Sequence, residues 1–189
     1  MVRKTGLAWN WWLVEMLAVS SAYMFASILT LYFFYPIQLK LVPEFPSFAS
    51  LLYLPHGVRV LSAWLLGWRS VIAMGPGAFF AQYYWVSERD MDATFFIILA
   101  SGLLVAPLAF KLFKMIGLES EATNGRVPRW QLVMLIGVVA SLLNSFSTNF
   151  ILGTSGINNL AFLVGDVFGL FLLVLILILF FRQMRIRGY

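Results

Sequence analysis

The sequence predicts an all-α membrane protein with six transmembrane helices, and composition, segment length and charge placement all favour this fold class. Hydrophobic residues make up 61% of the 189 residues, charged residues make up 11%, and the mean hydropathy is +0.89. A spanning helix needs about 20 mostly apolar residues, and six segments approach that length between short connectors. Because no polar stretch is long enough for a soluble domain, we expect one integral membrane domain over residues 1–189.

The six expected spans lie near residues 11–35, 48–67, 70–86, 93–116, 130–152 and 159–181. The first is longer than the apolar core of a signal peptide and no small-residue cleavage site follows it, so we expect a retained anchor. The second and third spans are short, and Gly67-Trp68-Arg69 leaves room only for a tight turn between them. The longest connector, residues 117–129, carries mixed charge and turn signals typical of a flexible linker.

The second span is expected to be broken at Pro55-His56-Gly57. Proline removes a backbone donor and clashes with the preceding helical turn, whereas it is favoured in the first turn of a helix. We therefore expect an extended entry from the outer side and a helix that starts near Pro55. Irregular backbone at membrane depth survives only when protein buries it or water lines it.

The basic residues predict the orientation of the chain. With six spans and the N-terminus inside, ten of the 13 Lys and Arg residues fall on the cytoplasmic side, and only Lys40 and Arg89 fall outside. This is the positive-inside pattern. We expect both termini in the cytoplasm and location in a bacterial inner membrane. Since the net charge of +5 comes from membrane edges, no nucleic-acid partner is expected.

Two opposite charges, Arg59 and Asp166, interrupt the expected second and sixth spans. An ionisable side chain at the bilayer centre costs roughly 2.5–3.5 kcal/mol, so we expect the two to meet inside the bundle as an ion pair. A buried pair of this kind can be purely structural. Alternatively, a helix start beside His56 and Arg59 can bind an anionic or carbonyl-bearing ligand.

The expected fifth span carries a polar face formed by Ser141, Asn144, Ser145 and Thr148, which follow helical spacing. Such a face serves either as helix-packing contact or as the wall of a cavity. The candidate ligand-binding residues, between the second, fifth and sixth spans, are His56, Arg59, Asn144, Thr148 and Asp166. Arg59 is the expected electrostatic anchor of a small-molecule ligand.

Small residues predict close helix contacts in two spans. Ala18, Ala22 and Ala26 recur every fourth residue in the first span and fit a neighbouring helix in the chain or in a partner. Gly165 and Gly169 form a flat face in the sixth span.

Two further features concern packing and charge at the membrane edge. Gly75-Pro76-Gly77 predicts a helix break at a packing crossing. Glu15, near the cytoplasmic interface, is expected to reach the aqueous phase or to pair with Arg3 or Lys4.

Enzyme chemistry finds little support in the sequence. There is no cysteine and one histidine, so neither a metal site nor a cofactor is expected. No glycine-rich phosphate loop or nucleophile elbow is present. We therefore expect a protein that is not an enzyme.

Three short motifs resemble the first-described type of membrane-associated sensor (MASE) domain of bacterial signalling proteins. They are Leu54-Pro55-His56-Gly57-Val58 followed by Leu65-Leu66-Gly67-Trp68-Arg69, then Gly75-Pro76-Gly77-Ala78-Phe79, and Val164-Gly165-Asp166-Val167-Phe168-Gly169. The resemblance implies a sensory, ligand-binding membrane fold. Those domains usually have about eight spans and precede cyclase, phosphodiesterase or kinase modules. This shorter chain is expected to stand alone and to signal through a partner protein.

A second resemblance leads to a different function class. Six spans in under 200 residues with an Ala-x-x-x-Ala stripe resemble the substrate-binding S-components of energy-coupling-factor vitamin transporters, in which the stripe docks on a coupling subunit. An accessory subunit of a larger membrane complex, or a homo-oligomer, is also consistent with the sequence. The expected partners are therefore the lipid bilayer, a small-molecule ligand and a signalling enzyme or a coupling subunit.

Overall fold

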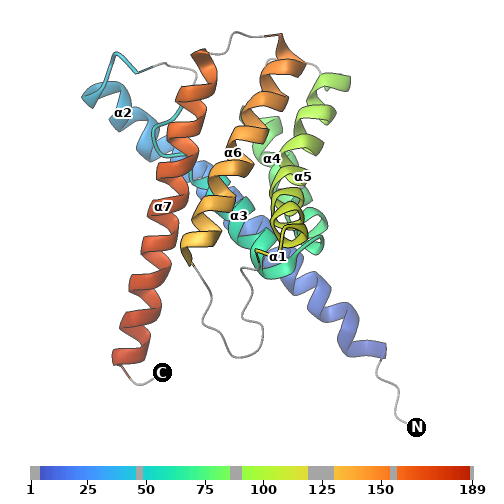
Figure 1. The fold of residues 1–189 in the computed structure, drawn as a ribbon. Coiled ribbons are helices and arrows are strands. Elements are labelled where there is room, and N and C mark those ends of the chain that lie inside the picture. The colour runs from blue at the N-terminus through green and yellow to red at the C-terminus, as the bar shows by residue number, and fades with distance from the viewer. Residues whose placement is uncertain (1–4, 46–48, 86–90, 119–129, 154–156, 188–189) are drawn as a thin grey trace.

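The computed structural model describes residues 5–45, 49–85, 91–118, 130–153 and 157–187, and these residues form helices without any strand (Figure 1). The elements are α1 (Thr5–Leu29), a π-helical turn η1 (Thr30–Phe34), α2 (Tyr35–Leu41), α3 (Leu54–Leu66), α4 (Arg69–Trp85), α5 (Ala93–Met115), α6 (Trp130–Leu152) and α7 (Ile157–Ile186). The prediction of an all-α fold is confirmed.

Four stretches of the described chain are long and apolar enough to cross a membrane. They are Trp11–Leu41, Ala93–Met115, Trp130–Ile151 and Leu160–Ile186. The expected second and third spans correspond to α3 and α4, which have 13 and 17 residues. At 1.5 Å per residue these two helices are about 20 and 26 Å long, shorter than the roughly 30 Å hydrocarbon core. Four crossings are therefore supported by length, and the six-span prediction is met only in part.

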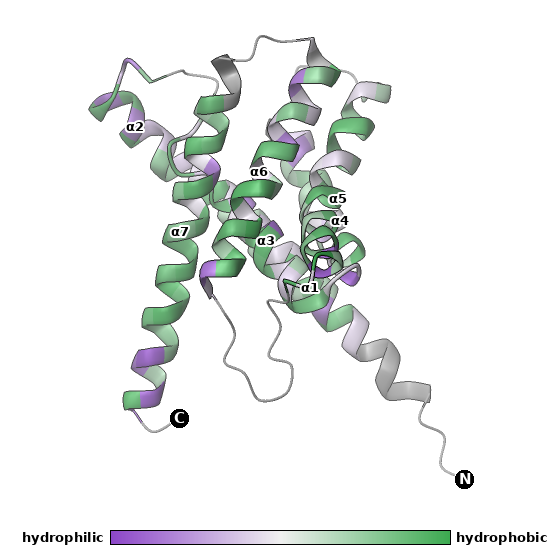
Figure 2. Ribbon diagram, viewed as in Figure 1, coloured by the Kyte–Doolittle hydropathy of each residue, from purple (hydrophilic) through white to green (hydrophobic). Residues whose placement is uncertain are grey.

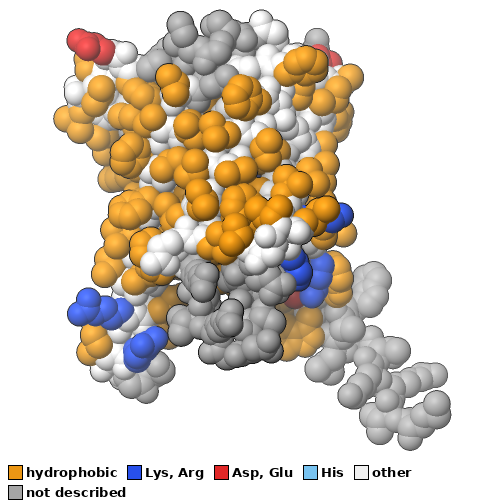
Figure 3. Space-filling model, viewed as in Figure 1, with side chains coloured by type: hydrophobic (Ala, Val, Ile, Leu, Met, Phe, Trp, Pro, Cys, Tyr) orange, Lys and Arg blue, Asp and Glu red, His pale blue; other side chains and the backbone are white. Residues whose placement is uncertain are grey.

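The outer surface of the bundle is apolar between two polar ends. Figure 2 shows hydrophobic residues along most of each helix, and Figure 3 shows one face on which hydrophobic side chains form a broad band. Large side chains such as Phe25, Leu65 and Phe146 are exposed on this surface. An exposed apolar patch of this size is not typical of a soluble protein, and a lipid bilayer would cover it.

The two ends of the bundle differ in charge. The end at which α1 begins and α7 ends carries Arg69 and the basic residues that close α5 and α7, and Figure 3 shows Lys and Arg gathered there. Lys40, near the end of α2, and Glu44, just after it, lie toward the opposite end, as does Asp92, just before α5 (Figure 1). The described residues thus show the charge asymmetry on which the predicted orientation rests.

The start of α3 is the feature that shapes the interior. Residues 49–53 are not helical and α3 begins at Leu54, so Pro55, His56 and Gly57 form its first turn. The helix start near Pro55 is confirmed. The expected break inside a longer spanning helix is not observed, because Pro55 stands where its missing N–H breaks no helical hydrogen bond.

Polar side chains of the first span hold the non-helical segment 49–53 in place. Gln38 donates from Nε2 to the Ala49 carbonyl (2.9 Å) and accepts from the Leu51 N–H (2.6 Å). Thr30, in the π-helical turn, donates to the Leu52 carbonyl (3.3 Å) and accepts from the Leu54 N–H (3.2 Å). These bonds satisfy backbone N–H and C=O groups of the segment, for which lipid offers no hydrogen-bond partner.

The other side of this segment packs against α7. A side chain at Gly165 would collide with the Ser50 carbonyl, and one at Gly169 with the Tyr53 carbonyl. The Tyr53 N–H also donates to the Gly165 carbonyl (3.0 Å). The two glycines therefore allow a close approach, as the sequence predicts. The chain that approaches them is the non-helical segment 49–53 and the first residue of α3, and not the side of another helix.

The crossing of α1 with α4 differs from the prediction. Gly77 packs on Ser20, whose carbonyl oxygen would lie 2.5 Å from an added Cβ, and the Ser20 hydroxyl donates to the Ala73 carbonyl (2.9 Å). The crossing predicted at Gly75-Pro76-Gly77 is present, whereas the helix break is wrong because α4 continues through Pro76.

The alanine stripe of α1 does not make this contact: Ala18 and Ala22 are exposed and only Ala26 is buried. Glu15 pairs with Arg69. The expected partners Arg3 and Lys4 lie outside the described residues.

Candidate functional site: a polar cavity inside the helical bundle

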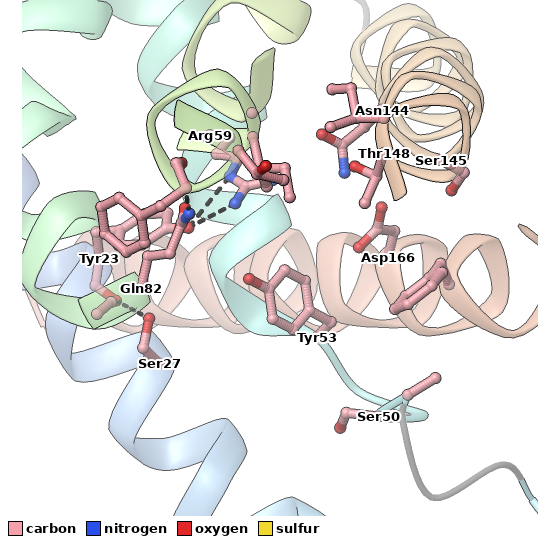
Figure 4. Close-up of a pocket in the computed structure, with 18 of the residues that line it drawn as sticks. Tyr23, Ser27, Ser50, Tyr53, Arg59, Gln82, Asn144, Ser145, Thr148 and Asp166 are labelled. Carbon is pink, nitrogen blue, oxygen red and sulfur yellow. Dashed lines mark hydrogen bonds between the residues drawn. The ribbon is translucent and has the colours of Figure 1, made fainter. Parts of the chain in front are cut away.

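A cavity of about 720 Å³ lies among α1, α3, α4, α5, α6 and α7. It reaches the end of the bundle at which α5 begins and α6 ends, because Asp92, Thr94 and Ile151 belong to its wall. Its polar lining consists of Tyr23, Ser27, Ser50, Tyr53, Arg59, Gln82, Asp92, Thr94, Asn144, Ser145, Thr148 and Asp166 (Figure 4). The volume falls in the range typical of small-molecule sites, roughly 300–1,000 Å³.

Arg59 projects into this cavity from the second turn of α3 and is held by Tyr23 of α1. Its Nη2 and Nε donate to the Tyr23 hydroxyl at 2.7 and 3.2 Å. Its Cζ also lies 5.6 Å from the centre of the Tyr23 ring and 5.9 Å from that of Tyr53, which is within cation–π range. The guanidinium group rests on α5 at Gly102, where an added Cβ would lie 3.3 Å from it. Arg59 is thus positioned by three elements.

Asp166 of α7 faces Arg59 across the cavity, and its carboxylate has partners of its own. Ser141 of α6 donates to Oδ2 at 2.6 Å, and the Nδ1 atom of His56 lies 3.5 Å from the same oxygen. The Nε2 atom of His56 is 3.1 Å from the carbonyl oxygen of Gly137. Both His56 and Asp166 are buried, at 2% and 4% exposure.

The expected ion pair between Arg59 and Asp166 is not among the contacts of the described residues. The contacts between basic and acidic side chains found there are Arg69 with Glu15 and His56 with Asp166, and the second is an ion pair only if the imidazole carries a second proton. Arg59 instead turns toward Tyr23, because the hydroxyl and the two aromatic rings give the guanidinium group polar and cation–π contacts on that side. The two charges share one cavity without direct contact.

The polar face of α6 forms part of the cavity wall. Asn144, Ser145 and Thr148 line it, and Ser141, one helical turn earlier in the chain, donates a hydrogen bond to Asp166. Ser145 is 2% exposed, and its hydroxyl has no hydrogen-bond partner among the described residues. A buried hydroxyl without a partner is uncommon in native structures, and here it borders open space in which a ligand atom or a water can bind.

Four of the five predicted ligand-binding residues, Arg59, Asn144, Thr148 and Asp166, line the cavity. The fifth, His56, lies behind Asp166 and does not reach the wall.

Sequence reasoning missed Tyr23 of α1, Tyr53 just before α3 and Gln82 of α4, which also line the site. A tyrosine or a glutamine inside a predicted span is itself a signal, because its polar group needs a partner away from water.

The described residues contain no cluster of His, Asp and Glu able to hold a metal ion. Comparison of the chain with protein-family models, with curated proteins and with solved structures finds no match. The geometry of the cavity is therefore the basis for any functional assignment.

Proposed function

We propose that this protein is a membrane-embedded ligand-binding protein of the sensory type, acting through a partner protein and without enzymatic activity of its own. The observation that carries the proposal is Arg59: a guanidinium group facing a cavity of about 720 Å³, with no carboxylate in contact among the described residues. A cation kept in a membrane interior in this way is a functional-site signal. We assign the first ligand contact to the side of the Arg59 guanidinium group that does not face the Tyr23 hydroxyl.

The wall chemistry supports a small organic ligand with both apolar and polar parts. The rings of Tyr23, Tyr53 and Phe95 offer flat apolar contact, while the side chains of Asn144 and Thr148 can orient polar groups. In the orientation proposed here both chain termini lie in the cytoplasm of a bacterial cell, so the cavity mouth near Asp92 faces the outside.

A second candidate function is that of a substrate-binding subunit of a small-molecule transporter. The observation in its favour is that Ala18 and Ala22 are exposed on α1, so this stripe remains free for a partner helix. An accessory role in a larger complex would use the same surface without a ligand.

Two measurements test the proposal. Mass spectrometry of the purified protein should identify a co-purifying small molecule, and its binding should be lost in Arg59→Gln and kept in the matched control Arg69→Gln. Equal binding by both variants would reject Arg59 as the anchor. Affinity purification from the native membrane then separates the candidates, since a kinase or cyclase indicates sensing and an ATPase with a coupling subunit indicates transport.

A further inference from the structure

The hydrogen bonds of His56 determine where its protons can lie. The Gly137 carbonyl oxygen can only accept, so Nε2, at 3.1 Å from it, carries a proton and donates. Nδ1 points toward Oδ2 of Asp166 at 3.5 Å and has no hydrogen-bond partner among the described residues. If His56 were neutral and Asp166 ionised, the lone pair of Nδ1 would face a negatively charged oxygen. One further proton, on Nδ1 or on Oδ2, removes this repulsion.

Arg59 is the one positively charged group of the described interior that shares the cavity with the pair. The charged and titratable groups facing the pair are Tyr53 and Arg59, on the segment that leads into α3 and on α3, and Tyr23 from α1. The helix α6 contributes the uncharged Ser141, α4 contributes Gln82 to the shared cavity, and α5 contributes Asp92 at the mouth. Within the described interior, Arg59 and the His56–Asp166 pair therefore decide the charge of the site.

We propose that the His56–Asp166 pair retains one exchangeable proton, and that Arg59 thereby leaves the cavity interior with a net charge of +1 that selects an organic monoanion. With the proton the pair is neutral overall, whether it sits on the imidazole or on the carboxyl group. Without it the pair is negative, cancels Arg59 and weakens anion binding. The inference rests on the proposed ligand-binding function and adds to it the ligand class, a carboxylate-type anion, and a dependence of binding on the proton.

The proton can be observed directly because His56 is the single histidine of the chain. Protein labelled with ¹⁵N-histidine and placed in lipid nanodiscs gives one imidazole spectrum. At neutral pH the wild type should show Nδ1 protonated or in a strong hydrogen bond, and Asp166→Asn should shift it to the Nε2–H neutral form. A wild-type spectrum with a free Nδ1 lone pair would overturn the inference without use of any ligand.

Binding is tested with two probes of equal shape, benzoate and its neutral analogue benzamide, which suit the aromatic wall. At pH 6 benzoate should raise the melting temperature of the wild type by several degrees more than benzamide does. The apparent affinity for benzoate should fall at least tenfold between pH 6 and pH 9. Asp166→Asn should bind benzoate with little pH dependence, while Glu15→Gln, a carboxylate removed outside the cavity, should behave as the wild type.

Two outcomes overturn the inference. The first is that benzoate and benzamide stabilise the wild type equally, or that neither stabilises it. The second is that the pH dependence of benzoate binding seen in the wild type persists in Asp166→Asn. A neutral or cationic molecule found bound at Arg59 would also overturn it while leaving the proposed ligand-binding function intact. If no molecule co-purifies with the protein and Arg59→Gln binds benzoate as the wild type does, both results would instead count against the proposed function.

Discussion

At the residue scale, the interior depends on how each buried polar group is satisfied. Arg59 has the Tyr23 hydroxyl and two aromatic rings, Asp166 has Ser141 and His56, and Gln38 has two backbone groups. Each arrangement uses partners far apart in the sequence. Because an unsatisfied buried polar group costs about 1–3 kcal/mol, these contacts hold the helices in one relative arrangement as well as shaping the cavity.

The Tyr23 hydroxyl offers a test of this view. Tyr23→Phe keeps the ring over the guanidinium group and removes the oxygen that accepts two hydrogen bonds from Arg59. Since hydrogen bonds to charged groups contribute about 1.5–3 kcal/mol, this variant should be destabilised by roughly that amount. The matched control is Tyr32→Phe, which removes an exposed hydroxyl bonded to Tyr84 and should change stability by less than about 0.5 kcal/mol. Thermal unfolding in detergent measures both, and equal melting temperatures would contradict the role of Tyr23.

At the element scale, glycines determine which helices come close. Gly77 lets α4 cross α1 at Ser20, and Gly165 and Gly169 let the chain before α3 run against α7. These contacts explain how the short helix α4 packs against α1 and how the start of the short helix α3 packs against α7. They also place Arg59 and Asp166 on opposite sides of one cavity.

Two glycines of α4 form a matched pair for testing the crossing. An added Cβ at Gly77 would lie 2.5 Å from the Ser20 carbonyl, whereas one at Gly75 meets nothing within 4 Å. Both changes to Ala gain similar helix propensity, up to about 1 kcal/mol. Gly77→Ala should lower the melting temperature because two backbones must move apart, and Gly75→Ala should leave it unchanged or raise it. A Gly77→Ala protein as stable as Gly75→Ala would show that the crossing is loose.

The start of α5 predicts a dependence of stability on pH. Asp92 caps this helix by accepting from the Phe95 N–H (2.9 Å), and this bond lowers the pKa of the Asp92 carboxyl below its ordinary value of 3.8. A group whose pKa is lower in the folded protein stabilises it above the unfolded pKa, and this contribution is lost as the pH falls through the folded pKa. The melting temperature of the wild type should therefore exceed that of Asp92→Ala at pH 6, and the two should converge at an acidic pH below the lowered pKa of Asp92. Asp92→Asn, which still caps but does not titrate, should keep its advantage over Asp92→Ala at both pH values.

At the scale of the whole molecule, the sequence predicts what depends on apolar length and fails where distant polar groups meet. The bounds of α6 and the helix start near Pro55 follow from local pattern and from proline chemistry. The contact between Arg59 and Tyr23 does not, because 36 residues separate them and only packing brings α1 against α3. Charge complementarity favoured Asp166 as the partner of Arg59, and it could not reveal that His56 and Ser141 already contact that carboxylate.

The number and direction of the crossings is the last and broadest prediction. The chain has no cysteine, so single cysteines can be introduced and labelled in intact cells with a membrane-impermeant maleimide. Glu44→Cys, after α2, and Met91→Cys, before α5, lie at the end opposite the basic residues and should react from outside. Gln183→Cys, in the last turns of α7, and Met115→Cys, at the end of α5, lie at the basic end and should react only after the cells are opened, as the positive-inside rule requires. Positions 44 and 91 flank the α3–α4 hairpin, so labelling of both from outside means that α3 and α4 together cross the membrane an even number of times. A cysteine in place of the exposed Trp68, in the turn between them, decides whether that number is two or zero. Protection of Trp68→Cys in intact cells together with rapid labelling in opened cells supports six crossings. Labelling from outside would establish four and reject the six-span topology.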